Sequence, residues 1–190
     1  ETLTQKYDVF VTNPPYMGGS GMSVKLSDYV KKYYPDSKSD LFAVFIEHCG
    51  QMVKKNCYQA MITQQTWMYS SSFKNLRVKM MLNEIVGMIH LGTRAFDEIG
   101  GEVVQPTAFV CHKGFLSGYS GTYFKLDSYG SQREKEMAYL HKQNCYIFKN
   151  RKFAELPGGI YSYWASDGVI NAFNTSKSLG DIATPKRGMC

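Results

Sequence analysis

Strand-like and helix-like stretches alternate over the first 113 residues, and their order is the strongest constraint on the fold of this chain. Four short, mainly apolar runs have the length and composition of β-strands. They lie at Tyr7–Val11, Tyr58–Ile62, Ile85–Ile89 and Val103–Cys111. Two amphipathic segments separate the first three runs, so the order is strand–helix–strand–helix–strand–strand. This order predicts an α/β protein with a largely parallel sheet.

The two amphipathic segments are expected to be helices that face the core. Ser39 can cap the first helix, which begins at Asp40. Apolar side chains recur at helical spacing in both segments: Leu41, Phe45, Cys49 and Met52 in the first, and Phe73, Leu76 and Met80 in the second. Residues 17–39, before the first helix, are polar and predict a long functional or mobile loop.

The later part of the sequence gives weaker signals. Pro106 removes one hydrogen-bond donor from the Val103–Cys111 strand, which predicts an edge strand or a bulge there. Thr122–Leu126 and Tyr146–Phe148 are expected to be short strands. Val169–Phe173 has the pattern of one or two helical turns.

Composition excludes several classes of protein. The 190 residues are 44% hydrophobic and 20% charged, as in a folded domain, and no apolar run has the ~20 residues that a membrane helix needs. The five cysteines are scattered without a C-x-x-C pair, so we expect neither a disulfide framework nor a metal site, and a location in the reducing cytoplasm. The net charge of +6 favours a polyanionic partner only weakly.

The string Asn13-Pro14-Pro15-Tyr16 directly follows the first strand, and its residue types suit the positioning of an amino group. The side-chain carbonyl of Asn13 and the main-chain carbonyl of Pro14 can accept both protons of an exocyclic amine and aim its lone pair. Pro15 restricts the backbone of Pro14 to an extended conformation. Tyr16 offers a ring face on which a flat heterocycle can stack.

NPPY after a strand resembles the catalytic motif of the S-adenosylmethionine-dependent amino-methyltransferases, above all the DNA adenine-N6 methyltransferases. The likeness continues through DLFAVFIEHC (40–49), YQAMITQQTWMYSSSFKNLR (58–77) and the segment 85–113. The insert in residues 14–42 is similar to that of large adenine methylases from type II restriction–modification systems and BREX phage-exclusion systems. The resemblance implies a catalytic site at Asn13, Pro14, Pro15 and Tyr16, and cofactor contacts from Asn13, Asp40 and Phe42.

The resemblance also implies a partial fold. In this family a glycine-rich loop and an acidic residue that hold S-adenosylmethionine precede the catalytic motif, and this sequence starts just ahead of that motif. We therefore expect a fragment: a partial Rossmann-like methyltransferase sheet, mostly parallel with one antiparallel strand at Val103–Cys111, that lacks the N-terminal cofactor-binding strands. Residues 1–150 are then the catalytic half of the domain, and residues 151–190 lead toward a target-recognition domain.

Such a fragment has expected properties of its own. Most of the cofactor site is missing from it, so it should be inactive alone and should bind S-adenosylmethionine weakly or not at all. It should also self-associate through an exposed sheet edge or apolar face.

Double-stranded DNA is the partner that the resemblance implies. Lysines interleave with tyrosines in the insert, and the side chains that could contact phosphates are Lys25, Lys31, Lys32, Lys38 and, at the start of the second helix, Ser72. A solvated loop face explains the lysines equally well, and Ser72 can simply cap its helix. Arg77 is expected to be an ordinary exposed basic residue.

Two other functions remain open at this point. The same motif can serve a methyltransferase that acts on RNA or on a protein amide. The segment can also be a DNA-binding module without catalytic activity.

Overall fold

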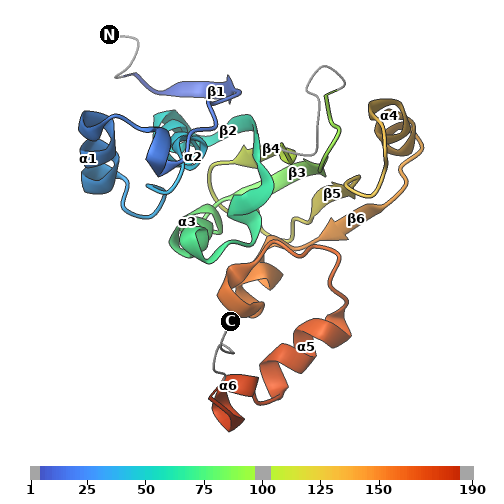
Figure 1. Cartoon of the computed structure of the whole chain (residues 1–190). Coiled ribbons are helices and arrows are strands. Elements are labelled where there is room, and N and C mark those ends of the chain that lie inside the picture. Colours follow the sequence, from blue (N-terminus) through green and yellow to red (C-terminus); the bar gives the residue numbers. More distant parts are fainter. Residues whose placement is uncertain (1–4, 97–103, 185–190) are drawn as a thin grey trace.

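The computed structural model describes residues 5–96 and 104–184, which form a six-stranded sheet flanked by helices (Figure 1). The strands stand in the order β1-β2-β4-β3-β5-β6. Their bounds are β1 Tyr7–Thr12, β2 Val53–Gln64, β3 Glu84–His90, β4 Pro106–His112, β5 Gly121–Lys125 and β6 Cys145–Phe148.

Strand directions confirm the predicted α/β class and its mostly parallel sheet. β1 is parallel to β2, β3 is parallel to β5, and both β2 and β3 are antiparallel to β4. β4 is thus the predicted antiparallel strand, although residue 103 of the predicted range lies outside the described residues. β6 is a second antiparallel strand, because the chain turns back through a helix and pairs β6 beside β5 at the sheet edge.

The prediction of an edge position for β4 was wrong. β4 lies in the middle of the sheet between β2 and β3. Pro106 is its first residue, a position at which a strand tolerates proline. The carbonyl of Pro106 accepts from the amides of Leu91 and Gly92. The register shift lies in β3, between Ile85 and Gly87.

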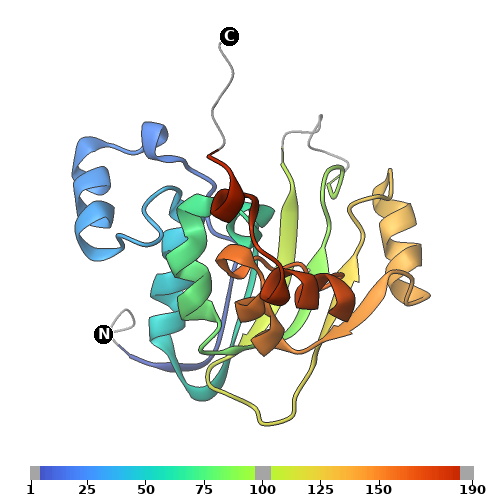
Figure 2. The same ribbon diagram turned by 90° about the horizontal axis from the view of Figure 1, so that it is seen from below.

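Helices α2 (Leu41–Met52) and α3 (Lys74–Met80) pack on one face of the sheet (Figure 2). Asp40 rather than Ser39 caps α2, because its carboxylate accepts from the amide of Phe42. The stripe predicted for α2 was partly wrong. Phe42, Ala43, Ile46 and Cys49 enter the main core, whereas Leu41 packs toward a second, smaller cluster. α2 is therefore covered on two sides. The stripe predicted for α3, Phe73, Leu76 and Met80, is buried as expected.

The second cluster exists because the segment 17–39 is not a plain loop. It contains α1 (Val24–Tyr33), which Ser23 caps by accepting from the amide of Leu26 at 3.3 Å. Val30 of α1 and Tyr34 pack against Val44 of α2. The sequence pattern did not reveal this helix, because its apolar face is completed by Val44 of α2.

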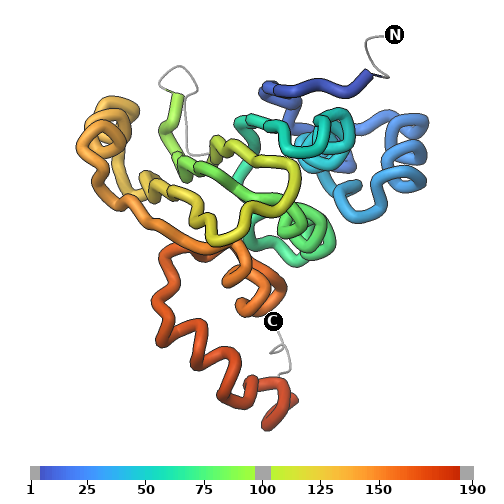
Figure 3. Tube along the Cα trace, turned by 180° about the vertical axis from the view of Figure 1, so that it is seen from behind, coloured from blue at the N-terminus to red at the C-terminus, as the bar shows by residue number. Residues whose placement is uncertain are grey.

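The C-terminal third adds α4 (Gln132–Leu140), α5 (Asp167–Thr175) and α6 (Leu179–Ile182), of which α5 matches the predicted helical turns. Phe153, Tyr161, Tyr163 and Ile170 belong to the same core cluster as α2 and α3. The packed unit therefore continues past the boundary expected at residue 150. Beyond Ile170, α5 and α6 extend away from the sheet (Figure 3). No helix within residues 5–96 and 104–184 has the length and hydropathy of a membrane span.

Candidate active site

The four residues Asn13 to Tyr16 follow the last residue of β1, at the carboxyl edge of the parallel strands. Prolines end the strand there because they cannot donate to the ladder. Asn13 and Pro15 are exposed, Pro14 is buried and Tyr16 is half-buried. The structure thus presents the amide of Asn13 to solvent while Pro14 anchors the turn.

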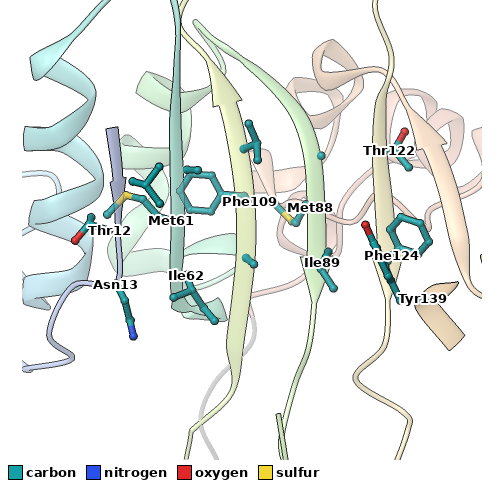
Figure 4. Close-up of a pocket in the computed structure, with 15 residues that line it drawn as sticks. Thr12, Asn13, Met61, Ile62, Met88, Ile89, Phe109, Thr122, Phe124 and Tyr139 are labelled. Atoms are coloured by element: carbon teal, nitrogen blue, oxygen red, sulfur yellow. The ribbon is translucent and has the colours of Figure 1, made fainter. Parts of the chain in front are cut away.

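Asn13 lies at the rim of an apolar hollow on the sheet face opposite α2 and α3. The volume of this hollow is about 580 Å³. In Figure 4 its side chain extends past the end of β1, with Thr12 and Ile62 nearby. The floor of this hollow is apolar and includes Ile62, Ile89 and Phe124. The Asn13 amide thus lies at the strand ends, where α/β sheets bind ligands, at the margin of an open apolar sheet face.

Tyr16 is held by an aromatic contact. Its ring meets that of Phe42 edge-to-face, with centroids 6.0 Å apart at an interplanar angle of 79°. Burial raises the pKa of the Tyr16 phenol, so the side chain is neutral at physiological pH. Because Tyr16 is only partly buried, the accessible part of its side chain can serve as a stacking surface.

Asp40 fixes the backbone that follows the motif. Its Oδ1 accepts from the amide of Met17 at 3.0 Å and from the amide of Phe42 at 3.3 Å. The amide of Leu41 donates to the carbonyl of Met17 at 2.9 Å, and a bridge pairs Gly18 with Asp40. The Asp40 carboxylate thus caps α2 and also connects Met17, at the start of the segment that contains α1, to the end of that segment.

We predict that Asp40→Ala lowers the free energy of unfolding by about 1 kcal/mol, the usual cost of losing an N-cap. Amide hydrogen exchange at Met17 and Phe42 should accelerate in the same variant. Asp40→Asn keeps the accepting oxygen and should retain most of the protection. Ser166→Ala removes the cap of α5, where Ser166 accepts from the amide of Val169, and should leave Met17 unchanged. Unaltered exchange at Met17 in Asp40→Ala would contradict the role of this carboxylate.

The three predicted cofactor contacts differ in their accessibility. Asn13 is exposed, and the two bonds of Asp40 both use Oδ1, which leaves Oδ2 outside them. Phe42 is fully buried against Tyr16 and Phe73. Of the predicted set, Asn13 and Asp40 therefore have polar atoms that the described hydrogen bonds leave unused, whereas the ring of Phe42 is enclosed by core side chains.

The predicted phosphate contacts lie on the surface, in two groups. Lys25, Lys31 and Lys32 are exposed on α1, and Lys38 is exposed in the turn before α2. Ser72 is exposed in a 3-10 turn before α3, and its side chain caps neither that turn nor the helix. The structure thus joins the lysines on one segment, and Ser72 precedes the neighbouring helix α3, whose Asn75 donates to Asp36 of that segment at 2.9 Å.

A second group of polar residues on the carboxyl edge was not predicted from the sequence. Gln65 follows β2, His90 ends β3, and Lys125 ends β5. Because β2, β3 and β5 run in the same direction as β1, these residues share the edge that carries Asn13. Their position after predicted strands is the one signal that could have pointed to them.

Comparison with known protein families decides the identity of this fold and motif. The model of the Eco57I restriction-modification methylase family matches residues 2–96, half of the chain, and this range contains Asn13–Tyr16 and Asp40. The chain belongs to the Eco57I restriction–modification methylase family. The expected resemblance to adenine methylases of restriction–modification systems is confirmed.

Curated relatives of this Eco57I-family chain are adenine-specific methyltransferases. PglX of Lacticaseibacillus casei (strain Zhang) is 47% identical over 196 residues, which cover 100% of this chain and 16% of PglX. BrxX of Escherichia coli O9:H4 (strain HS) is 42% identical over 185 residues, covering 95% of this chain and 15% of BrxX. The chain thus spans about a sixth of the length of the curated relatives that it matches.

The fold of the Eco57I-family chain is also found in a solved DNA complex. A chain in the cryo-electron microscopy structure of the DrdV–DNA complex superposes with a TM-score of 0.60 at 14% identity. The match covers 88% of this chain and 19% of that one. At this identity the likeness shows a common fold.

Proposed function

We propose that this segment carries the catalytic motif of a methyltransferase that methylates the N6 amino group of an adenine flipped out of DNA. The observation that carries the proposal is the placement of Asn13-Pro14-Pro15-Tyr16 at the carboxyl end of β1, with Asn13 exposed beside an apolar hollow. The adenine-specific relatives support the choice of base, and the restriction–modification family supports DNA as the substrate. The parent protein would then act in a prokaryotic restriction–modification or phage-defence system.

In the proposed mechanism the motif positions the amine. The Asn13 side-chain carbonyl and the Pro14 main-chain carbonyl accept the two N–H groups of adenine N6, which aims the nitrogen lone pair out of the ring plane. S-adenosylmethionine, when bound, supplies the methyl group. The nitrogen would form a bond to the methyl carbon as the carbon–sulfur bond breaks, and it would then lose one proton to water. Asn13 and Pro14 hold the amine throughout, and no general base is required.

Tyr16 captures the flipped base in this mechanism. Its ring is fixed against Phe42, so a base can stack on it without further ordering of the side chain. Base–aromatic stacking contributes about 1–3 kcal/mol, which corresponds to roughly 5- to 150-fold in affinity for the extruded base.

The test of the Tyr16 role compares two variants of the full-length protein. Tyr16→Ala should slow turnover and weaken base capture by about tenfold or more. Tyr16→Phe keeps the ring face and should retain most of the activity. Steady-state methylation and the fluorescence of 2-aminopurine at the target position measure the two effects. Equal activities of Tyr16→Ala and the wild type would contradict stacking on this ring.

We further propose that α1 contacts the DNA backbone through Lys25, Lys31, Lys32 and, after the helix, Lys38. These lysines lie in the segment 17–39, which directly follows the motif at the carboxyl edge of the sheet. The turn after α1 is held against α3 by the ion pair of Asp36 with Lys79 at 2.7 Å. Replacing any one of these lysines by alanine should reduce the salt dependence of DNA binding by about one unit of slope. A phosphate contact from Ser72 belongs to the same proposal.

The open sheet face supports the proposed self-association of this segment. Val9 and Val11 of the edge strand β1 are 57% and 72% exposed, and the apolar hollow continues across the sheet. In the parent, we propose that the remaining part of the methyltransferase domain covers this face and supplies most of the S-adenosylmethionine site.

We predict that the 190-residue chain associates in a concentration-dependent manner, measured by light scattering. Val11→Lys places a charge on the exposed edge strand and should shift the chain toward monomer. Val24→Lys is the matched control, because Val24 is 78% exposed on α1 and away from the sheet. A wild-type chain that stays monomeric at high concentration would contradict this prediction.

A further inference from the structure

A second cavity lies on the same edge of the sheet as the catalytic motif. Its volume is about 310 Å³, and it is bounded by residues at the ends of β2, β3 and β5 together with Tyr69 and Trp164. The size falls at the lower end of the range for small-molecule sites, about 300–1,000 Å³. Three inter-strand spacings separate β1 from β3, so the cavity lies about 14 Å along the edge from Asn13.

A buried hydrogen-bond acceptor that is unused within the described residues lies beside the cavity. His90 is 4% exposed, and its Nε2 donates to the side-chain oxygen of Gln65. The Gln65 amide group in turn donates to the Tyr69 hydroxyl at 3.2 Å and to Gln105, which fixes the orientation of Gln65 and hence the His90 tautomer. Nδ1 then carries a lone pair, and among the described residues it has no hydrogen-bond partner. Burial lowers the pKa of His90, so the ring is neutral at physiological pH.

Aromatic and charged groups complete the wall. Trp164 is 40% exposed and stacks on His90, with ring centroids 6.2 Å apart at 28°. The ammonium of Lys125 lies 5.1 Å from the centre of the Trp164 ring and 2.7 Å from the Asp127 carboxylate. Tyr69, 47% exposed, lies among the lining residues. The cavity thus combines flat aromatic surface with the ion pair of Lys125 and Asp127, and His90 Nδ1 lies buried behind its wall.

We infer that this cavity binds one nucleobase of the DNA within a few nucleotides of the target adenine. A flat ring can stack on Trp164 or Tyr69, an exocyclic amine or ring N–H can donate to Asp127, and Lys125 can bind a base carbonyl or the adjoining phosphate. An offset of about 14 Å corresponds to about four base steps of stacked DNA. The inference rests on the proposed action on DNA, and it adds a base contact outside the methylation site.

The experiment uses the full-length protein and duplexes in which 2-aminopurine replaces a single base, either at the methylated position or at one of the positions in the flanks on either strand. The signal at the methylated position reports the proposed function. We expect one flanking position to change its fluorescence on binding as well. Trp164→Ala should abolish that flanking change and weaken DNA binding about tenfold, while the signal at the methylated position persists.

Two further variants separate the site from a general loss of packing. Trp164→Phe keeps an aromatic face and should retain the flanking signal. Phe115→Ala removes an exposed ring that also lies beneath a cation, Arg151 at 4.0 Å, but lines a different cavity, and it should leave both signals unchanged. The inference would be overturned if the wild-type protein showed the signal at the methylated position but no flanking signal, or if the flanking signal persisted in Trp164→Ala. Absence of the signal at the methylated position would instead overturn the proposed function.

Discussion

Asn13→Ala in the full-length protein should reduce single-turnover methylation of an adenine-containing duplex by at least about 100-fold. The exposed Asn13 amide is the side-chain acceptor that the motif offers to the target amine. Without it the amine keeps one fixed contact, the Pro14 carbonyl, and its lone pair is no longer aimed. DNA affinity should stay within about twofold of the wild type, because most affinity comes from phosphate contacts elsewhere.

Asn13→Asp is the matched variant for this experiment. An aspartate keeps an accepting oxygen at the same distance from the backbone, so a part of the single-turnover rate should survive. Filter binding on the same preparations separates the loss of catalysis from a loss of DNA binding. A near-normal single-turnover rate in Asn13→Ala would show that the motif does not position the amine.

Arg77→Met should lower the free energy of unfolding of the chain by about 3–5 kcal/mol, measured by chemical denaturation. Arg77 is 1% exposed, and its guanidinium donates to three carbonyls: Trp67 at 2.9 Å, Ser70 at 2.7 Å and Gly158 at 2.9 and 3.1 Å. Methionine fills a similar volume but leaves these buried carbonyls without donors. The link between α3 and the segment around Gly158 should therefore break.

Two controls accompany this variant. Arg77→Lys keeps the charge and can reach some of the carbonyls, so it should be less destabilising. Arg133→Met removes a positive charge from an exposed position of α4 and should change stability by less than about 0.5 kcal/mol. If Arg77→Met and Arg133→Met had equal stabilities, the buried guanidinium network would not contribute to folding.

The main elements could be predicted because their signals are local. Short, mainly apolar runs indicated β1 to β4, and Phe73, Leu76 and Met80 indicated the buried face of α3. The position of β4 depends on pairing partners far away in the sequence, so Pro106 alone suggested an edge that the sheet does not have there. α1 could not be predicted because its apolar face is completed by Val44 of α2.

The candidate site shows the same division. The motif Asn13–Tyr16 is contiguous and visible in the sequence, whereas the second cavity draws on residues from Gln65 to Trp164 that only the sheet topology brings together. The exposed position predicted for Arg77 was wrong, because its acceptors are backbone carbonyls, which leave no trace in the side-chain pattern. The hydrogen bond from the Met17 amide to Asp40 joins residues 23 positions apart, so the sequence did not predict it either.

The most direct test of the proposed function is the identity of the methylated product. The full-length protein is incubated with S-adenosylmethionine that carries an isotopically labelled methyl group, in a mixture of duplex DNA, RNA and a glutamine-containing peptide. Each polymer is then hydrolysed and analysed by mass spectrometry, with Asn13→Ala in parallel. We expect the label in N6-methyladenine from the DNA, and its absence with Asn13→Ala. Label in the RNA or the peptide, or no transfer by the wild-type protein, would contradict a DNA adenine methyltransferase.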